Sequence, residues 1–234
     1  MTLQVGMLAK NGIVLVGDVW TYTDAHGATS VWAAEARSKI TLFGSDLAVS
    51  RAHDLTQARM VSDAIGSNLT SEYWENPEAR MEEIARSALS SECAWRGVQC
   101  LVVLRRPSLA LFKVECARDP GGQQNVCSCS RSTGHVFAGD CHNPATFWAT
   151  RYLLTERTTD HAIKELLPLA VQIVVDAGRI NNGSIRGLEI VSCDDGGFHR
   201  LSESESRAWA IEATRRGQAI ERLVTAPLDA REYE

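Results

Sequence analysis

The sequence predicts an α+β fold in which two sheets pack face to face between layers of helices. Runs of strand-like residues, separated by turn signals, alternate along the chain with pairs of helical segments. With the short strand at 135–138 left out of the count, the order is four strands, two helices, three strands, two helices, two strands and one helix. Such an order is typical of sheets that bury one face against each other and the other face against helices.

The chain opens with a predicted β-hairpin. Residues 3–9 alternate in the manner of a strand, and residues 13–16 form a second β-rich run that ends at Asp18. Asn11-Gly12 lies between them and takes the positive φ angles of a tight turn at low cost. Because free termini usually fray, a chain that starts inside a sheet, with no tail ahead of it, is expected to hold its first residues in place.

The remaining elements follow from hydrophobic periodicity and from Pro, Gly and Asn signals. The polar stretch 20–37 is predicted to be a loop. Pro168 is expected to kink the fourth helix or to mark its start, and Gly178 to cap its end. No linker or composition break is visible, so residues 1–234 are predicted to form a single domain. The other predicted elements are strands at 39–43, 47–50, 98–105, 109–116, 125–130, 135–138, 188–192 and 198–201, and helices at about 54–69, 77–95, 143–155, 158–177 and 203–223.

Composition excludes several classes of function. The chain has 234 residues, a net charge of −5 and no basic run, so nucleic acid is not an expected partner. No apolar stretch approaches the roughly 20 residues of a membrane span, and the N-terminus lacks the basic and apolar regions of a signal peptide. We therefore expect no membrane association and a cytoplasmic location.

The seven cysteines, an odd number, indicate reduced thiols in a cytosolic chain of this size. Cys100 and Cys116 fall in apolar strand-like runs and are expected to be small core residues. Cys127 and Cys129, with Cys141 and two histidines downstream, raise the alternative of a metal site. Their C-x-C spacing is not a paired C-x-x-C arrangement, so we expect no metal and no cofactor.

Thr2 is a candidate nucleophile. Removal of Met1 would leave Thr2 with a free α-amine beside its own hydroxyl. A hydroxyl needs a base to take its proton at neutral pH, and an α-amine, with an ordinary pKa of about 8, supplies that base within the same residue. A small second residue normally permits removal of the initiating methionine.

Three segments carry a resemblance to a known family. They are the opening TLQVGMLAKNGIVLVGD, the segment SKITLFGSDLAVS and the segment HDLTQAR. Together they resemble the proteasome β-type subunits, which are N-terminal-nucleophile threonine proteases, and look closest to bacterial homologues that form homo-oligomeric rings. The resemblance implies a four-layer αββα sandwich, with Thr2 as the nucleophile, Lys39 as its electrostatic partner and Asp18 as the carboxylate that holds Lys39.

The chain departs from this family at several supporting positions. Ser50 matches a glycine whose backbone N–H is the oxyanion donor, a role that a backbone group keeps through the change. Asp140 matches a small serine, and its carboxylate would raise the pKa of the Thr2 amine and weaken that base. Asn182 can still hydrogen-bond where the family has serine, whereas Arg179 replaces an aspartate.

The resulting hypothesis is a threonine-type endopeptidase that hydrolyses polypeptides through Thr2 once Met1 is removed. The resemblance implies a self-compartmentalised homo-oligomer of stacked rings, such as a tetradecamer, while any unfoldase or cap stays unknown. The departures leave two alternatives open: a ring-forming scaffold of the same fold with little or no activity, and a hydrolase of small amides that uses the same nucleophile.

Overall fold

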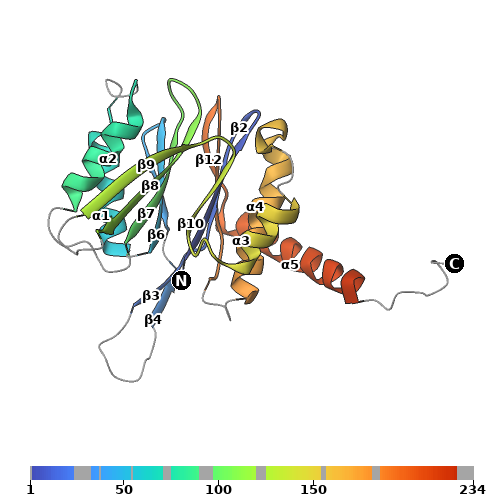
Figure 1. The fold of residues 1–234 in the computed structure, drawn as a ribbon. Coiled ribbons are helices and arrows are strands. Elements are labelled where there is room, and N and C mark those ends of the chain that lie inside the picture. Colours follow the sequence, from blue (N-terminus) through green and yellow to red (C-terminus); the bar gives the residue numbers. More distant parts are fainter. Residues whose placement is uncertain are drawn as a thin grey trace.

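Two five-stranded antiparallel sheets form the centre of the molecule (Figure 1). The first sheet has the strand order β10-β1-β2-β11-β12 and the second the order β5-β6-β7-β8-β9. The structure is a computed structural model, which describes residues 2–23, 33–36, 38–53, 55–70, 75–89, 97–119, 125–153, 157–180 and 185–225.

The first sheet is built on the predicted opening hairpin, which is confirmed. Gln4 lies opposite Gly17 and Ala9 opposite Gly12, so the turn consists of Lys10 and Asn11, and Gly12 is the first residue of β2. The expected turn centred on Asn11-Gly12 is therefore wrong by one position, and Asn11 does not have the positive φ angle that was expected. The predicted hairpin near the end of the chain is also present and joins the same sheet. The strands of this sheet are β1 (Leu3–Ala9), β2 (Gly12–Gly17), β10 (His135–Gly139), β11 (Glu189–Asp194) and β12 (Gly197–Arg200).

The second sheet runs in chain order from β5 to β9 and contains the predicted hairpin of residues 98–105 and 109–116. Its strands are β5 (Ile40–Phe43), β6 (Leu47–His53), β7 (Val98–Leu104), β8 (Ala110–Arg118) and β9 (Asn125–Ser132). The expectation of a loop over 20–37 is wrong at both ends, where β3 (Trp20–Thr23) pairs with β4 (Ala33–Ala36). The β-branched and aromatic run Trp20–Thr23 suits a strand, and residues 24–32 and 37 lie outside the described ranges.

Helices cover the outer face of each sheet, so the predicted four-layer αββα arrangement is confirmed (Figure 1). On the second sheet lie α1 (Leu55–Asn68) and α2 (Pro77–Ala88). On the first sheet lie α3 (Pro144–Trp148), α4 (Ile163–Ile180) and α5 (Glu203–Thr225), with a π turn, η2 (Ala149–Leu153), and a 3₁₀ turn, η3 (Thr158–Asp160), between α3 and α4. None of the helices described is long and apolar enough to cross a membrane.

Three helix ends differ from the sequence prediction. Helix α2 ends at Ala88 rather than near residue 95, although residues 90–96 lie outside the described ranges. Pro168 lies inside α4 and does not mark its start, while the alternative that it kinks the helix stays a prediction. Helix α4 starts at Ile163, where the Glu165 carboxylate accepts the N–H of Ala162 at 2.6 Å. Gly178 is not a cap, because it too lies inside α4. A Cβ there would meet the carbonyl oxygen of Ile185, so the missing side chain lets the segment before β11 approach the helix.

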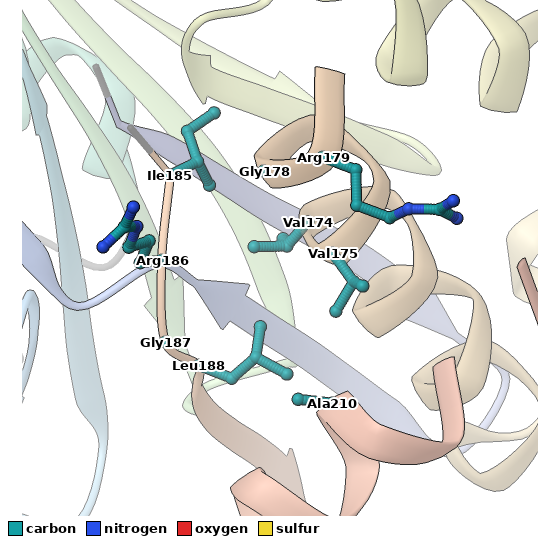
Figure 2. A pocket seen from close by; sticks show the side chains of 9 residues that line it. All are labelled: Val174, Val175, Gly178, Arg179, Ile185, Arg186, Gly187, Leu188 and Ala210. Carbon is teal, nitrogen blue, oxygen red and sulfur yellow. The ribbon is translucent and has the colours of Figure 1, made fainter. Parts of the chain in front are cut away.

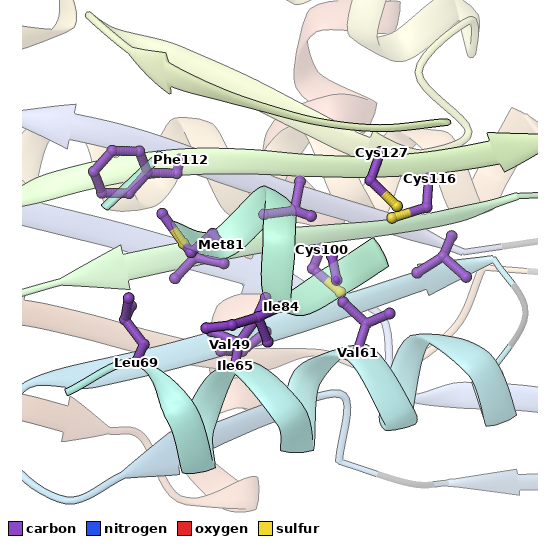
Figure 3. Close-up of a cluster of buried hydrophobic side chains, with 14 of the residues drawn as sticks. Val49, Val61, Ile65, Leu69, Met81, Ile84, Cys100, Phe112, Cys116 and Cys127 are labelled. Atoms are coloured by element: carbon purple, nitrogen blue, oxygen red, sulfur yellow. The ribbon is translucent and has the colours of Figure 1, made fainter. Parts of the chain in front are cut away.

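The core has three parts, one at each junction between layers. Figure 3 shows the part between the second sheet and the helices α1 and α2, which we call the outer core. Cys100 and Cys116 are residues of this core, as predicted. The part between the sheets includes Ile13, Leu15, Ile40, Leu101, Leu111 and Val191. The part between the first sheet and its helices includes Leu3, Val5, Met7, Val14, Val171 and Val174.

The alternation of side chains along β1 determines which sheet face each of the first residues points to. Leu3, Val5 and Met7 pack toward the helices of the first sheet. Successive side chains of a strand point to opposite faces, so Thr2 and Gln4 face the second sheet. The hairpin therefore presents the Thr2 hydroxyl to the space between the two sheets.

Candidate active site

Thr2 lies directly before β1, and its backbone is fixed by the end of β10. The Thr2 carbonyl oxygen accepts a hydrogen bond of 2.8 Å from the N–H of Asp140. This approach depends on Gly139, which has a φ of +91° and where a Cβ would collide with the Thr2 carbonyl oxygen. A glycine adopts this left-handed conformation at no steric cost, so the Gly139-Asp140 pair holds Thr2 in place.

Lys39 brings an ammonium group to the Thr2 hydroxyl. Its Nζ lies 2.9 Å from Thr2 Oγ1 and 2.6 Å from Asp18 Oδ2. The Lys39 side chain is 2% exposed and that of Asp18 is 0% exposed. A buried pair of this kind needs good geometry and further hydrogen bonds to offset the loss of hydration, which the short contacts provide.

Asp18 follows β2 and is tied to the start of β1. Its second carboxylate oxygen, Oδ1, accepts the N–H of Leu3 at 2.9 Å, and its own N–H donates to the Leu3 carbonyl at 3.3 Å. The hairpin register thus places Asp18 beside the residue that follows Thr2. The structure brings together the three residues that the sequence predicts as catalytic.

Burial changes the acidity of both partners of this ion pair. It raises the pKa of the Asp18 carboxyl, which the charge and hydrogen bond of Lys39 act to lower. Burial also lowers the pKa of the Lys39 ammonium, against the opposing effect of Asp18. An ammonium with a lowered pKa exchanges a proton with a neighbouring hydroxyl more readily than an exposed lysine does.

The backbone of Lys39 is held as firmly as its ammonium group. Its carbonyl oxygen accepts the N–H of Arg51 at 3.0 Å and the Arg51 Nε–H at 3.3 Å. Its N–H donates to Glu189 Oε2 at 2.8 Å. Lys39 therefore enters β5 in a fixed orientation with its side chain directed at Thr2.

Ser50 lies in the middle of β6, opposite Ile40 on one neighbouring strand and Leu101 on the other. Its side chain is fully buried, and its hydroxyl donates to Gln4 Oε1 at 2.7 Å. Ser50 thus contributes a link between the two sheets beneath Thr2. Its predicted part as an oxyanion donor stays a prediction.

Asp140 lies beside Thr2 through its backbone. One carboxylate oxygen, Oδ2, accepts a hydrogen bond from Asn143 Nδ2 at 3.1 Å. Asn143 also caps α3, because its Oδ1 accepts the N–H of Ala145 at 2.9 Å. The carboxylate of Asp140 is thereby turned toward the start of α3, and its predicted influence on the Thr2 amine stays a prediction.

Arg179 belongs to the last turn of α4 and pairs with two acids, Glu221 at 3.2 Å and Asp176 at 3.8 Å. It lines a cavity of about 480 Å³ whose walls come mainly from α4 and the segment before β11 (Figure 2). Asn182, the neighbouring supporting residue in the prediction, lies outside the described residues. Arg179 is therefore engaged with α5, and its correspondence to the family's aspartate stays a prediction.

The cysteines considered for a metal site point to the core or to local partners. Burial raises the pKa of Cys129 to about 12, and Cys127 packs in the outer core. The Cys141 thiol donates to the Phe137 carbonyl at 3.3 Å. Among the residues that the structure describes, no three metal-binding side chains gather at one place.

Sequence reasoning missed Glu189 and Gln99, whose side chains accept hydrogen bonds from backbone N–H groups next to the site. Gln99 Oε1 accepts the N–H of Gly139 at 2.8 Å, and Glu189 accepts the N–H of Lys39. The signal for Glu189 is a single acid at the start of the apolar strand LEIVS. A charged residue that begins a buried strand is retained only when it is paired.

Comparison with known proteins supports the fold. No protein-family model matches the chain, and no curated protein matches it. Among solved structures, the chain is similar to a Gly-1 mutant of Anbu from Hyphomicrobium sp. strain MC1. The TM-score is 0.67 at 16% identity, and the match covers 98% of this chain and 99% of that chain. This likeness shows the fold alone, an α+β fold of the N-terminal-nucleophile hydrolase type.

The assignment to the proteasome β-type subunits is overturned by these comparisons. A shared fold at 16% identity supports a proteasome-like architecture and no membership of that family. The opening segment led to the wrong family because many of its residues are required by the hairpin fold itself. The turn residue Asn11, the glycine that follows it and the buried run Ile13–Val16 are what any tight hairpin in a double-sheet core selects.

Proposed function

We propose that this chain is a hydrolase that cleaves amide bonds of polypeptides with the hydroxyl of Thr2 as nucleophile. The observation that carries the proposal is the contact of 2.9 Å between Lys39 Nζ and Thr2 Oγ1, together with the Asp18 carboxylate at 2.6 Å from the same nitrogen. A hydroxyl beside a buried ammonium forms an alkoxide more easily than a free threonine does.

The proposed reaction begins when Thr2 Oγ1 attacks the carbonyl carbon of the scissile amide. The α-amine of Thr2 takes the hydroxyl proton, and the Lys39 ammonium stabilises the charge that develops on the oxygen. The C–N bond then breaks, the leaving amine receives the proton, and an ester with Thr2 remains. A water molecule attacks this ester, again with the amine as base, and releases the acid.

This chemistry requires cleavage of the bond between Met1 and Thr2. While Met1 is attached, the nitrogen of Thr2 belongs to an amide, which is too weakly basic to take a proton from the hydroxyl. The proposal therefore includes processing to a Thr2 N-terminus. Two backbone contacts hold the C-terminal side of the threonine: the Asp140 N–H donates to the Thr2 carbonyl, and the Leu3 N–H donates to Asp18. Neither contact uses the nitrogen of Thr2.

The experiment combines intact mass with a covalent probe. Protein with Met1 removed is incubated with a peptide α′,β′-epoxyketone, which reacts with the hydroxyl and the amine of an N-terminal threonine. We expect one adduct on Thr2, hydrolysis of reporter peptides, and loss of both in Thr2→Ala. Protein that gives neither an adduct nor hydrolysis would refute the proposal.

The same measurements separate the two alternatives. A scaffold without activity would keep Met1 in the natural host and give no adduct. A hydrolase of small amides would give the adduct but cleave only short acyl compounds and no polypeptide. The homo-oligomeric ring and the single domain stay predictions, which native mass spectrometry and limited proteolysis test.

A further inference from the structure

Glu189 makes a set of contacts that converge on the residues around Lys39. It is the first residue of β11 and is 7% exposed. Its Oε2 accepts the N–H of Lys39 at 2.8 Å and the N–H of Ile40 at 3.1 Å. Its Oε1 accepts the Ser38 hydroxyl at 2.7 Å and is paired with the guanidinium of Arg200. One carboxylate therefore receives four hydrogen bonds.

The position of Glu189 in the fold explains these contacts. Within the part of the chain that the structure describes, strand β5 lies at the edge of the second sheet and pairs with β6 alone. The backbone N–H groups on its outer side therefore need partners from elsewhere. Glu189 reaches them from the first sheet. In that sheet it lies opposite Gly17, the residue before Asp18.

Lys39 is thus held at both ends from neighbouring strands of the first sheet. Asp18, after β2, binds its ammonium, and Glu189, on β11, binds its backbone N–H. Arg200 completes the link, because its guanidinium also donates to the Ile40 carbonyl at 2.6 Å. A displacement of about 1 Å at a reacting group can cost about 10²-fold in rate, so the backbone contact has a direct consequence for the contact with Thr2.

We propose that Glu189 is a positioning residue for the reaction, which fixes Lys39 by its backbone so that Nζ stays within hydrogen-bond distance of Thr2 Oγ1. This inference rests on the proposed function of Thr2. It adds a group that acts on the reaction by fixing the position of Lys39.

Glu189 affects Lys39 in two ways, through the hydrogen bonds that its side-chain length allows and through its negative charge. Two conservative variants separate these effects. The negative charge of Glu189 favours the ammonium form of Lys39, in addition to Asp18. Glu189→Gln keeps the length and one acceptor oxygen for the two N–H groups but removes the charge. Glu189→Asp keeps the charge but is one methylene too short to bridge the same groups.

The experiment measures the rate of epoxyketone adduct formation on Thr2 across pH, and kcat and KM for a reporter peptide, in both variants. We expect Glu189→Asp to lose about 10²-fold in kcat with little change in KM. Glu189→Gln is expected to keep kcat within about tenfold of the parent value. The alkaline limb of its rate–pH profile is expected to lie at lower pH than in the parent. Glu203→Gln and Glu203→Asp are the matched controls, because that side chain is 87% exposed.

Hydrogen exchange at the Lys39 and Ile40 amides provides a readout that does not need activity. We expect faster exchange in Glu189→Asp than in Glu189→Gln. If the parent forms the adduct and Glu189→Asp is as active as Glu189→Gln, the inference is overturned and the proposed function stands. If the parent forms no adduct, the proposed function fails. The exchange rates then decide alone: a difference between the variants supports the hold on Lys39, and equal rates overturn it.

Discussion

The Nζ of Lys39 lies 2.9 Å from the Oγ1 of Thr2, although the two residues are 37 positions apart and enter different sheets. Thr2 leads into β1 of the first sheet, and Lys39 leads into β5 of the second. The contact is therefore made by the packing of two sheets and not by a local turn. Both residues stand at the ends of strands, where side chains can be functional while the strands behind them carry the core.

Replacement of Lys39 by methionine tests this contact most directly. Methionine keeps much of the packing volume and removes the ammonium, so the developing alkoxide loses its electrostatic partner. We expect kcat/KM and the rate of adduct formation to fall by about 10²–10³-fold, with Thr2 still processed. Lys164→Met, at an exposed position of α4, is the control and should leave both rates unchanged. A Lys39→Met protein with the parent's rate would contradict the assigned part of Lys39.

The pH dependence of the reaction should report both the amine of Thr2 and the ammonium of Lys39. The rate is expected to rise with pH as the amine loses its proton, and to fall again as Lys39 loses its own. Because burial lowers the Lys39 pKa, the alkaline limb should lie below the usual value of 10.5. Asp18 raises that pKa, so Asp18→Asn should move the limb to still lower pH. A limb that stays in place or moves upward in this variant would show that the limb does not report Lys39.

Asp18→Asn is also expected to destabilise the protein. The variant keeps an oxygen for the Leu3 N–H but leaves a buried ammonium without its counter-charge. Breaking a buried pair from one side typically costs about 3–5 kcal/mol in the free energy of unfolding, which urea denaturation measures. Asp46→Asn is the control, because its pair with Arg105 is more exposed and should contribute about 1 kcal/mol or less. Equal losses in the two variants would mean that the burial of Asp18 has no special consequence.

Much of the fold was predictable from the sequence because local signals agreed with the final packing. The Asn11-Gly12 signal located the first hairpin, although the turn itself lies one position earlier, and Asn143 before a proline marked the start of α3. The strands β3 and β4 were missed because they are short and separated by a long polar segment. Gly178 was misread as a cap. A side chain there would collide with the carbonyl oxygen of Ile185, and this close approach is not visible in the sequence.

The site was predictable only where a side chain carries the chemistry. Thr2 was a candidate from its own chemistry, whereas the parts of Asp18 and Lys39 were implied by the resemblance of the segments around them. Glu189 acts on a backbone N–H that lies 150 positions away. Asp140 contributes its own N–H, which any residue would supply. Hydrogen bonds that involve a backbone N–H group cannot be predicted from the spacing of residue types.

Gly139→Ala should weaken both the stability and the reaction, and a second glycine separates the two causes. Gly139 has a φ of +91°, and a Cβ there would meet the Thr2 carbonyl oxygen, whereas Gly44 has a φ of +62° with no atom within 4 Å of the added Cβ. Backbone strain alone costs about 1–2 kcal/mol at such a position, and this is the loss that we expect from Gly44→Ala in urea denaturation, with the adduct rate unchanged. Gly139→Ala is expected to lose more stability than that and at least about tenfold in adduct rate, because the displaced carbonyl carries the Thr2 hydroxyl away from Lys39. If both variants behave alike, the close approach of Gly139 to Thr2 does not determine the position of the nucleophile.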